Sequence, residues 1–195
     1  MEKVVAASLL MILASYTGAG YQPSYERDGR LILPKGYETW VFVGSNFGLA
    51  YNPDVVAITA LEVQRGEQRL FHNIYIEPSA FAQFIKTGEF PDPTVFVMES
   101  YTAGSKDPGG ILNDGFFNAD RSRVEAAVKD SHRPGRSEAD KVWAYYSFAT
   151  DRAGQPATAA PAFPDQACHA CHEMHAGHDN VWVQFYPKLR AWLKP

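Results

Sequence analysis

An alternating pattern of side chains runs through Thr94-Val95-Phe96-Val97-Met98-Glu99-Ser100-Tyr101-Thr102. Successive side chains of an extended strand point to opposite faces, so Phe96 and Met98 share a face. The break Pro91-Asp92-Pro93 precedes this segment and separates it from the elements before it. The pattern therefore predicts a strand over 94–102, with Phe96 and Met98 on the same side.

Further elements are predicted on both sides of this strand. Residues 55–63 are rich in β-branched side chains, and a turn at 65–67 connects them to a second apolar segment over 70–76, which predicts two paired strands. Residues 78–86 begin with proline, place Phe81, Phe84 and Ile85 on one face and end before Gly88, which predicts a short helix. We expect a helical turn leading into an apolar segment over 37–44, and another strand over 123–129.

The last third of the chain has less regular patterning. Residues 154–164 are rich in alanine and proline and predict a surface linker. Residues 179–194 start with a potential capping aspartate and carry apolar side chains at helical spacing. We therefore expect a C-terminal helix that Pro187 kinks or divides.

Composition narrows the class of protein. Of the 195 residues, 46% are hydrophobic and the formal net charge is -4, which fits a globular domain and argues against nucleic acid as a partner. Residues 1–19 combine a charged start, the apolar run 4–13 and a small-residue exit, which is typical of a secretory signal. We expect a signal peptide over 1–19, export to the periplasm, and a single domain over 20–195 with no membrane span.

The only two cysteines of the chain lie in Cys168-His169-Ala170-Cys171-His172. Two thiols at this spacing can form thioether bonds to the two vinyl groups of one haem, and the following histidine is then placed to bind the iron. The motif therefore predicts one covalent haem c, with Cys168 and Cys171 as attachment points and His172 as an axial ligand.

Three other interpretations of the cysteine pair stay open at this point. A zinc site would recruit two of His172, His175 and His178 as further ligands. A thioredoxin-like redox pair would require a βαβ neighbourhood, which the surrounding sequence does not predict. A structural disulfide would leave the neighbouring histidines without a role. We expect the side chain of His169 to point away from the iron, and His175 and His178 to be solvated or to bind a haem propionate.

Several segments resemble the cytochrome P-460 family, which includes the cytochromes c′-beta. The resemblance covers nearly all of the chain after residue 20, and it rests on the haem motif and on the segments 40–44, 71–78, 84–90, 94–97 and 185–190. It implies a mainly β (α+β) fold, with a curved antiparallel sheet, a few short helices and one covalently bound haem c. It also implies a homodimer.

The resemblance carries one departure that bears on activity. In the hydroxylamine-oxidising members, a lysine on the strand after the Pro/Asp turn forms an additional covalent bond to the haem, and the corresponding position here is Met98. A thioether cannot form that amine cross-link. The departure favours the c′-beta-like side of the family and leaves enzymatic activity an open question.

The resemblance further implies that the strand face with Phe96 and Met98 looks onto the distal side of the haem. An apolar distal pocket would leave the iron open to a small gas or nitrogen-oxide ligand. Alternatively, Met98 would bind the iron through sulfur, which favours electron transfer with a redox partner protein. The third hypothesis is an oxidase of hydroxylamine-like nitrogen compounds. In the last alternative, Met98 only fills space beside the haem and does not bind iron, which is the ordinary role of a buried methionine.

Overall fold

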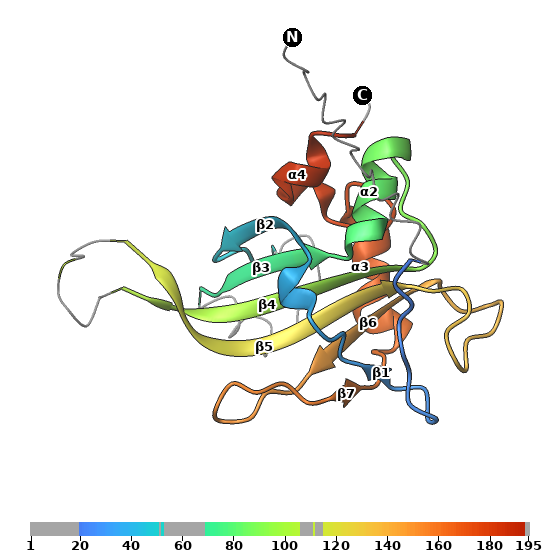
Figure 1. Cartoon of the computed structure of the whole chain (residues 1–195), viewed down its shortest axis with the longest axis horizontal. Helices are drawn as coiled ribbons and strands as arrows, with labels where there is room; N and C mark the ends of the chain where they lie inside the picture. The colour runs from blue at the N-terminus through green and yellow to red at the C-terminus, as the bar shows by residue number, and fades with distance from the viewer. Residues whose placement is uncertain (1–19, 51, 53–68, 106–110, 112–114, 194–195) are drawn as a thin grey trace, which may run out of the picture.

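Five antiparallel strands form a curved main sheet in the order β2-β3-β4-β5-β6 (Figure 1). The computed structural model describes residues 20–50, 52, 69–105, 111 and 115–193. The strands are β2 (Val41–Phe47), β3 (Phe71–Ile76), β4 (Thr94–Gly104), β5 (Phe117–Lys129) and β6 (Trp143–Phe148). Because the three central strands are neighbours in sequence as well as in space, they form an antiparallel meander.

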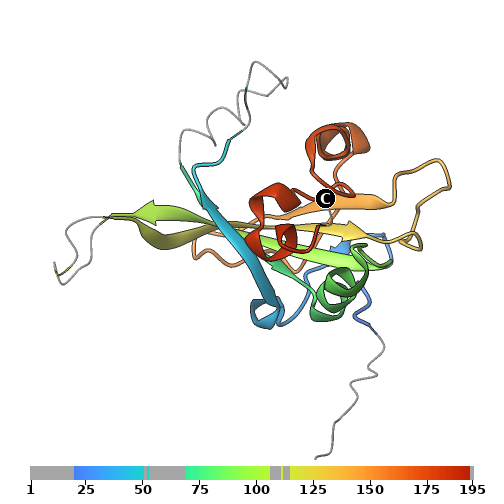
Figure 2. The same cartoon turned by 90° about the horizontal axis from the view of Figure 1, so that it is seen from above.

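Smaller elements surround this sheet. Strands β1 (Leu31–Ile32) and β7 (Ala159–Ala160) pair as a second, two-stranded antiparallel sheet. The helices are α2 (Pro78–Thr87), α3 (Asp165–His175) and α4 (Pro187–Arg190), with 3-10 turns η1 (Tyr37–Thr39) and η2 (Val183–Phe185). Helix α3 and the η2–α4 segment lie on one side of the main sheet (Figure 2). Among the described residues, no helix is both long and apolar enough to cross a membrane.

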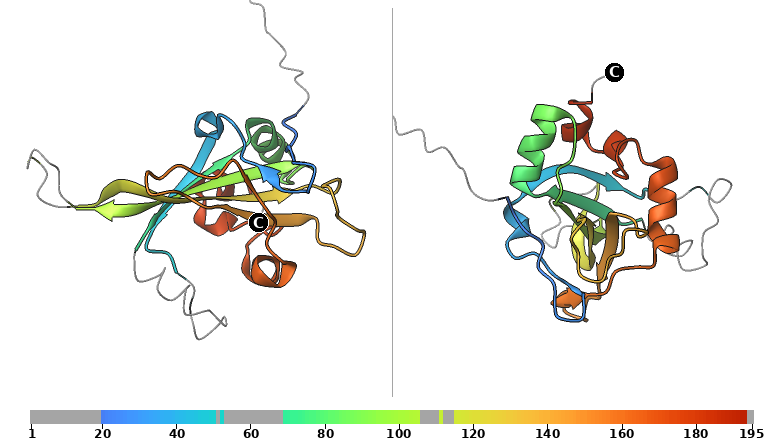
Figure 3. Two further views of the ribbon diagram at one scale, coloured as in Figure 1. Left: turned by 90° about the horizontal axis from the view of Figure 1, so that it is seen from below. Right: turned by 90° about the vertical axis from the view of Figure 1, so that its right-hand side faces the viewer.

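Each face of the main sheet covers its own apolar core. On the face toward α3, the buried core includes Phe96 and Tyr145, with Met98 and Cys168 packed against it. The opposite core includes Val95 and Val97 of β4 and is covered by the β1–β7 pair (Figure 3). Strand β4 is therefore buried on both sides, and the alternation of its side chains decides which residues reach each core.

A buried carboxylate lies in the opposite core. Glu99 is 4% exposed, and it accepts hydrogen bonds from the hydroxyl groups of Tyr37 (2.8 Å) and Tyr101 (3.0 Å). Arg121 adds an ion pair at 3.1 Å. Because a buried charge requires such partners, this network fixes η1 against the sheet and keeps Glu99 away from the other face.

The structure confirms the predicted fold class, which is mainly β with a curved antiparallel sheet and short helices. The predicted strand 94–102 lies within β4, and 123–129 forms the end of β5. The predicted helix 78–86 is α2, which ends at Gly88 with a left-handed φ of 82°. The predicted signal peptide 1–19, the strand 55–63 and the turn 65–67 lie outside the described residues.

Two predictions about the last third of the chain are wrong. The linker 154–164 contains strand β7, whose two small alanines are buried and pair with β1. The expected C-terminal helix over 179–194 is replaced by separate turns, η2 and α4. Asp179 and Asn180 have φ values of 42° and 61°, so the chain leaves the helical region where the helix was expected to begin. Pro187 starts α4 instead of kinking a longer helix.

Candidate functional site

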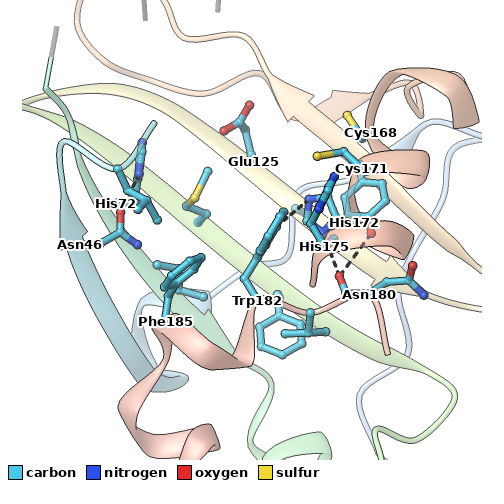
Figure 4. Close-up of a pocket in the computed structure, with 18 of the residues that line it drawn as sticks. Asn46, His72, Glu125, Cys168, Cys171, His172, His175, Asn180, Trp182 and Phe185 are labelled. Atoms are coloured by element: carbon cyan, nitrogen blue, oxygen red, sulfur yellow. Dashed lines mark hydrogen bonds between the residues drawn. The ribbon is translucent and has the colours of Figure 1, made fainter. Parts of the chain in front are cut away.

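Helix α3 carries the cysteine motif and presents it to the main sheet. Residues three and four apart lie on the same face of a helix, so Cys168, Cys171 and His172 point the same way. Figure 4 shows their side chains directed into a pocket between α3 and the sheet. The spacing of the motif predicts its chemistry, but not the helix that aligns its three side chains.

The imidazole of His172 is held at both nitrogens. Its Nδ1 lies 2.8 Å from the carbonyl oxygen of Asn180, to which it donates a hydrogen bond. Burial lowers the pKa of His172 to about 4, so the ring is neutral at pH 7. A ring that donates through Nδ1 to a carbonyl presents the lone pair of Nε2, which is the usual arrangement of a metal-binding histidine. In this structure, Nε2 accepts a hydrogen bond from Trp182 Nε1 at 3.2 Å.

The carbonyl that orients His172 lies in a tightly anchored left-handed turn. The Asp179 carboxylate accepts hydrogen bonds from Lys129 Nζ at 2.8 Å and from Trp143 Nε1 at 3.1 Å. Lys129 belongs to β5 and Trp143 to β6, so two strands of the main sheet position the turn. We refer to Lys129, Trp143 and Asp179 as the turn anchor, because they fix the Asn180 carbonyl that faces His172.

A cavity of about 570 Å³ opens between α3 and the sheet. The sheet wall nearest α3 is apolar and includes Phe96 and Tyr145, whose ring centroid lies 4.3 Å from that of His172. Further along the strands, Met98 and Glu125 line the wall as register partners on β4 and β5. A volume of this size, with mainly apolar walls, is typical of a site for an organic cofactor.

The segment that closes the cavity is the C-terminal chain. Trp182 and Phe185 line the cavity with their rings stacked at 6.0 Å between centroids. The following proline, Pro187, packs on Gly44 of β2, where a Cβ atom would lie only 3.1 Å from Pro187 Cδ. A glycine at position 44 therefore allows the C-terminal turns to approach the sheet closely.

All five residues that the sequence predicted for the site line this one cavity: Cys168, Cys171, His172, Phe96 and Met98. Their roles toward haem stay predictions. The residues that sequence reasoning missed are Tyr145, Asn180, Trp182 and Glu125 in the wall, and Asn46 and Arg123 at one end. Their positions depend on strand register and on the path of the C-terminal chain, which no local motif indicates.

The other histidines differ in part from expectation. His169 is buried, at 4% exposure, and its ring lies 6.5 Å from that of Tyr145. His178 is not simply solvated, because its ring packs against Phe84 and Phe90. His175 is partly buried and lines the cavity. His72 of β3 also lines the cavity.

The zinc interpretation has no geometric support in the described part of the chain. There, no group of three or more histidine, cysteine, aspartate or glutamate side chains is arranged to hold a metal ion. Instead of approaching the cysteines, His178 places its Nε2 3.7 Å from the Glu89 carboxylate. The two cysteines are thiols in this structure, so the disulfide interpretation gains no support either.

The residues present fit a haem. Two thiols and a neutral imidazole converge on a cavity with aromatic walls, and the Nδ1 hydrogen bond leaves Nε2 as the nitrogen that could bind a metal. Nε2 has one lone pair, so the Trp182 indole would have to give up its hydrogen bond to Nε2 for this nitrogen to hold iron. Cys168 and Cys171 would hold the haem edge, and His172 would bind its iron.

The sheet, the helix with its cysteine motif and the cavity together define a haem-binding cytochrome of the antiparallel β class. The model of the family Cytochrome P460 matches residues 34–183, which is most of the chain. The protein therefore belongs to the Cytochrome P460 family. A search of curated proteins gives no match.

Proposed function

We propose that this protein is an exported, periplasmic c-type cytochrome that binds a small nitrogen-oxide or similar gas ligand at a single haem. The observation that supports the proposal is one cavity in which Cys168, Cys171 and His172 face a wall formed by Phe96 and Met98. When bound, the haem supplies an iron centre that can take a diatomic ligand or exchange an electron. The charged start and apolar run of residues 1–19 support export.

The chain's own residues have distinct tasks in this proposal. The turn anchor and the Asn180 carbonyl orient His172. Burial lowers the pKa of His172 and keeps its ring neutral, as a metal ligand requires. Phe96 and Tyr145 exclude water from the wall nearest α3. Among the described residues that line the cavity there is no lysine, so none supplies the amine for a haem cross-link. This favours ligand binding over hydroxylamine oxidation as the proposed role.

The experiment is an absorption spectrum of the purified holoprotein in the ferric and ferrous states, with and without NO or CO. We expect a high-spin, five-coordinate ferrous spectrum that changes on adding either gas, because the wall beside Met98 offers no strong ligand. A six-coordinate low-spin spectrum that neither gas alters would reject an accessible distal site. Peptide mass spectrometry should find no haem–lysine adduct.

A second candidate function is electron transfer to a redox partner protein, with His172 and Met98 both bound to iron. The observation that favours it is Met98 itself, a partly buried thioether between Ile74 and Glu125 on the cavity wall. If Met98 binds iron, the ferric protein should show a methionine–iron charge-transfer band.

The substitution Met98→Ala separates the two candidates. Under the leading proposal, the variant should keep the high-spin spectrum and bind CO at least as readily, because a larger space is opened beside the iron. Under the electron-transfer candidate, the charge-transfer band should disappear and the midpoint potential should fall. Ile74→Ala is the matched control, since it also removes a buried side chain from the same row of the wall. A band that persists in Met98→Ala contradicts methionine ligation.

Gel filtration of the holoprotein tests the homodimer that the family resemblance implies. We propose that two copies of the exported holoprotein associate as a homodimer. A mass that corresponds to one chain at all concentrations would contradict it.

A further inference from the structure

A histidine and an asparagine face each other across two strands of the cavity wall. His72 on β3 is the register partner of Asn46 on β2, and both residues line the cavity. Directly opposite side chains of an antiparallel pair lie close enough to interact. Here the Nδ1 atom of His72 lies 2.9 Å from the Oδ1 atom of Asn46. In Figure 4 the two side chains lie on the far side of the pocket from His172 and the cysteines.

The contact with Asn46 determines which nitrogen of His72 carries the proton. Burial, and then the nearby charge of Arg123, lower the pKa of His72 to about 4, so the ring is neutral at pH 7 and holds a single N–H. An amide oxygen can only accept a hydrogen bond, so this N–H is on Nδ1 and donates to Asn46 Oδ1. Nε2 of His72 therefore carries no proton and presents a lone pair.

The lone pair of His72 Nε2 is accessible. Nε2 has no hydrogen-bond partner among the described residues, and it is not one of their fully buried unpartnered atoms, so it retains accessible surface. Side chains of a strand stand roughly perpendicular to the sheet, and Nε2 is farther from the backbone than Nδ1. His72 also shares its strand face with Ile74, which lines the same cavity. Nε2 therefore projects from the sheet on the cavity side.

The position of His72 relative to His172 gives this lone pair a possible task. The cavity lies between α3, which carries His172, and the sheet, which carries His72. A ligand that binds iron opposite His172 would therefore approach the sheet wall. His175 also lines the cavity, but it follows His172 by three residues on α3 and so projects from the same side as the proposed iron ligand.

We propose that Nε2 of His72 accepts the proton of small weak acids, HX, that enter the cavity and bind the proposed haem iron as X⁻. Hydrogen cyanide, hydrazoic acid and hydrogen peroxide belong to this class. The inference rests on the proposed function, because X⁻ requires the iron. His72 acts as a general base, and Asn46 is a positioning residue that holds the proton on Nδ1 and leaves Nε2 free to accept.

The step moves one proton and no electron. The H–X bond breaks, its proton is held by His72 Nε2, and its electron pair stays on X⁻, which binds the ferric iron. The protein therefore takes up HX as a whole and releases no proton to the solvent. NO and CO carry no proton, so their binding does not require His72.

The first test is stopped-flow absorption of the ferric holoprotein with potassium cyanide at pH 7, where cyanide is almost entirely hydrogen cyanide. We expect His72→Leu to slow cyanide association about hundredfold or more, because a positioned base typically contributes at least that factor. His72→Gln is closer in shape but has no basic nitrogen, so it should be slow as well. His132→Gln removes an exposed imidazole outside the cavity and should change nothing.

Variants of Asn46 test the positioning role. Asn46→Leu should slow cyanide association about tenfold, because it removes the hydrogen bond that holds the proton on Nδ1. Asn46→Asp keeps an acceptor for the Nδ1–H and should bind cyanide at nearly the wild-type rate. Equal rates for Asn46→Leu and the wild type would contradict the role of Asn46.

Proton release gives a second readout, which a purely structural role of His72 would not change. A pH-indicator dye in weakly buffered solution should detect no proton release when the wild type binds cyanide. His72→Leu has no base to hold the proton, so it should release one proton for each cyanide bound. A wild type that releases this proton, and that binds cyanide no faster than His72→Leu, would overturn the inference.

Carbon monoxide separates this inference from the proposed function. Ferrous His72→Leu should bind CO at the wild-type rate, which shows that its pocket is intact. If CO binds both proteins and cyanide association is not slowed, the proposed function stands and the inference fails. If neither NO nor CO binds the wild type, both fail. A ferric spectrum that changes from low-spin to high-spin in His72→Leu would show that Nε2 binds the iron itself, which also overturns the role as proton acceptor.

Discussion

Replacing Cys168 and Cys171 together with serine should give a protein from which acidified organic solvent extracts all the haem. Both thiols project from one face of α3 into the cavity, and the chain has no other cysteine to substitute for them. The loss should be complete, because serine cannot form a thioether bond. The measurements are the intact mass of protein matured in a host with working haem-attachment machinery, and the haem left after extraction.

Two comparisons make this test specific. Ala170→Ser changes an exposed position of the same helix and should keep the covalent haem. Each single cysteine variant should keep one thioether bond and therefore retain haem with a shifted absorption maximum. If the unmodified protein itself weighs no more than its polypeptide, the covalent attachment that we propose does not occur.

The substitution Asp179→Ala should lower the free energy of unfolding by about 2–3 kcal/mol, because it removes an acceptor from two partners at once. Lys129 Nζ and Trp143 Nε1 both donate to this carboxylate, and the Lys129 side chain is only 21% exposed. The loss stays below that of a fully buried ion pair, since water can still reach the ammonium group. Urea denaturation of the holoprotein measures it.

Asp179→Ala should also change the haem through His172. Without the turn anchor, the Asn180 carbonyl no longer holds the Nδ1–H as firmly, so the imidazole becomes a weaker electron donor. We expect a higher midpoint potential and a lower iron–histidine stretching frequency. Asp120→Ala, at an exposed position on β5, is the control. An Asp179→Ala variant that matches this control in both stability and stretching frequency would show that the turn anchor has no influence on His172.

The parts of the site that sequence could predict are those encoded by local spacing. Cys168, Cys171 and His172 follow from a short motif, and the shared face of Phe96 and Met98 follows from strand alternation. The same alternation explains why Glu99, between them and Ser100 in sequence, reaches the opposite core.

The remaining parts depend on pairings between distant residues. The hydrogen bond between His72 and Asn46 exists only because the register of β2 and β3 aligns these two residues. The Asn180 carbonyl reaches His172 because the chain reverses through two left-handed residues, where apolar spacing instead suggested a helix. In this segment the hydrogen bonds of Asp179 to the sheet outweigh the helical pattern. No local signal in the sequence shows which of these two influences determines the backbone conformation.

The anchoring of the C-terminal turns on the sheet also bears on the order of biosynthesis. A nascent chain that has emerged only as far as His172 already contains both thiols and every strand of the main sheet, but it lacks the carbonyl that orients the imidazole and the aromatic rings that close the cavity. Contacts between distant parts of a chain, such as those of Asp179 with Lys129 and Trp143, form late in folding. The two thiols are therefore accessible before the pocket around them is complete. If haem is attached as we propose, the attachment machinery would therefore meet an open cleft, which later folding would close around the haem.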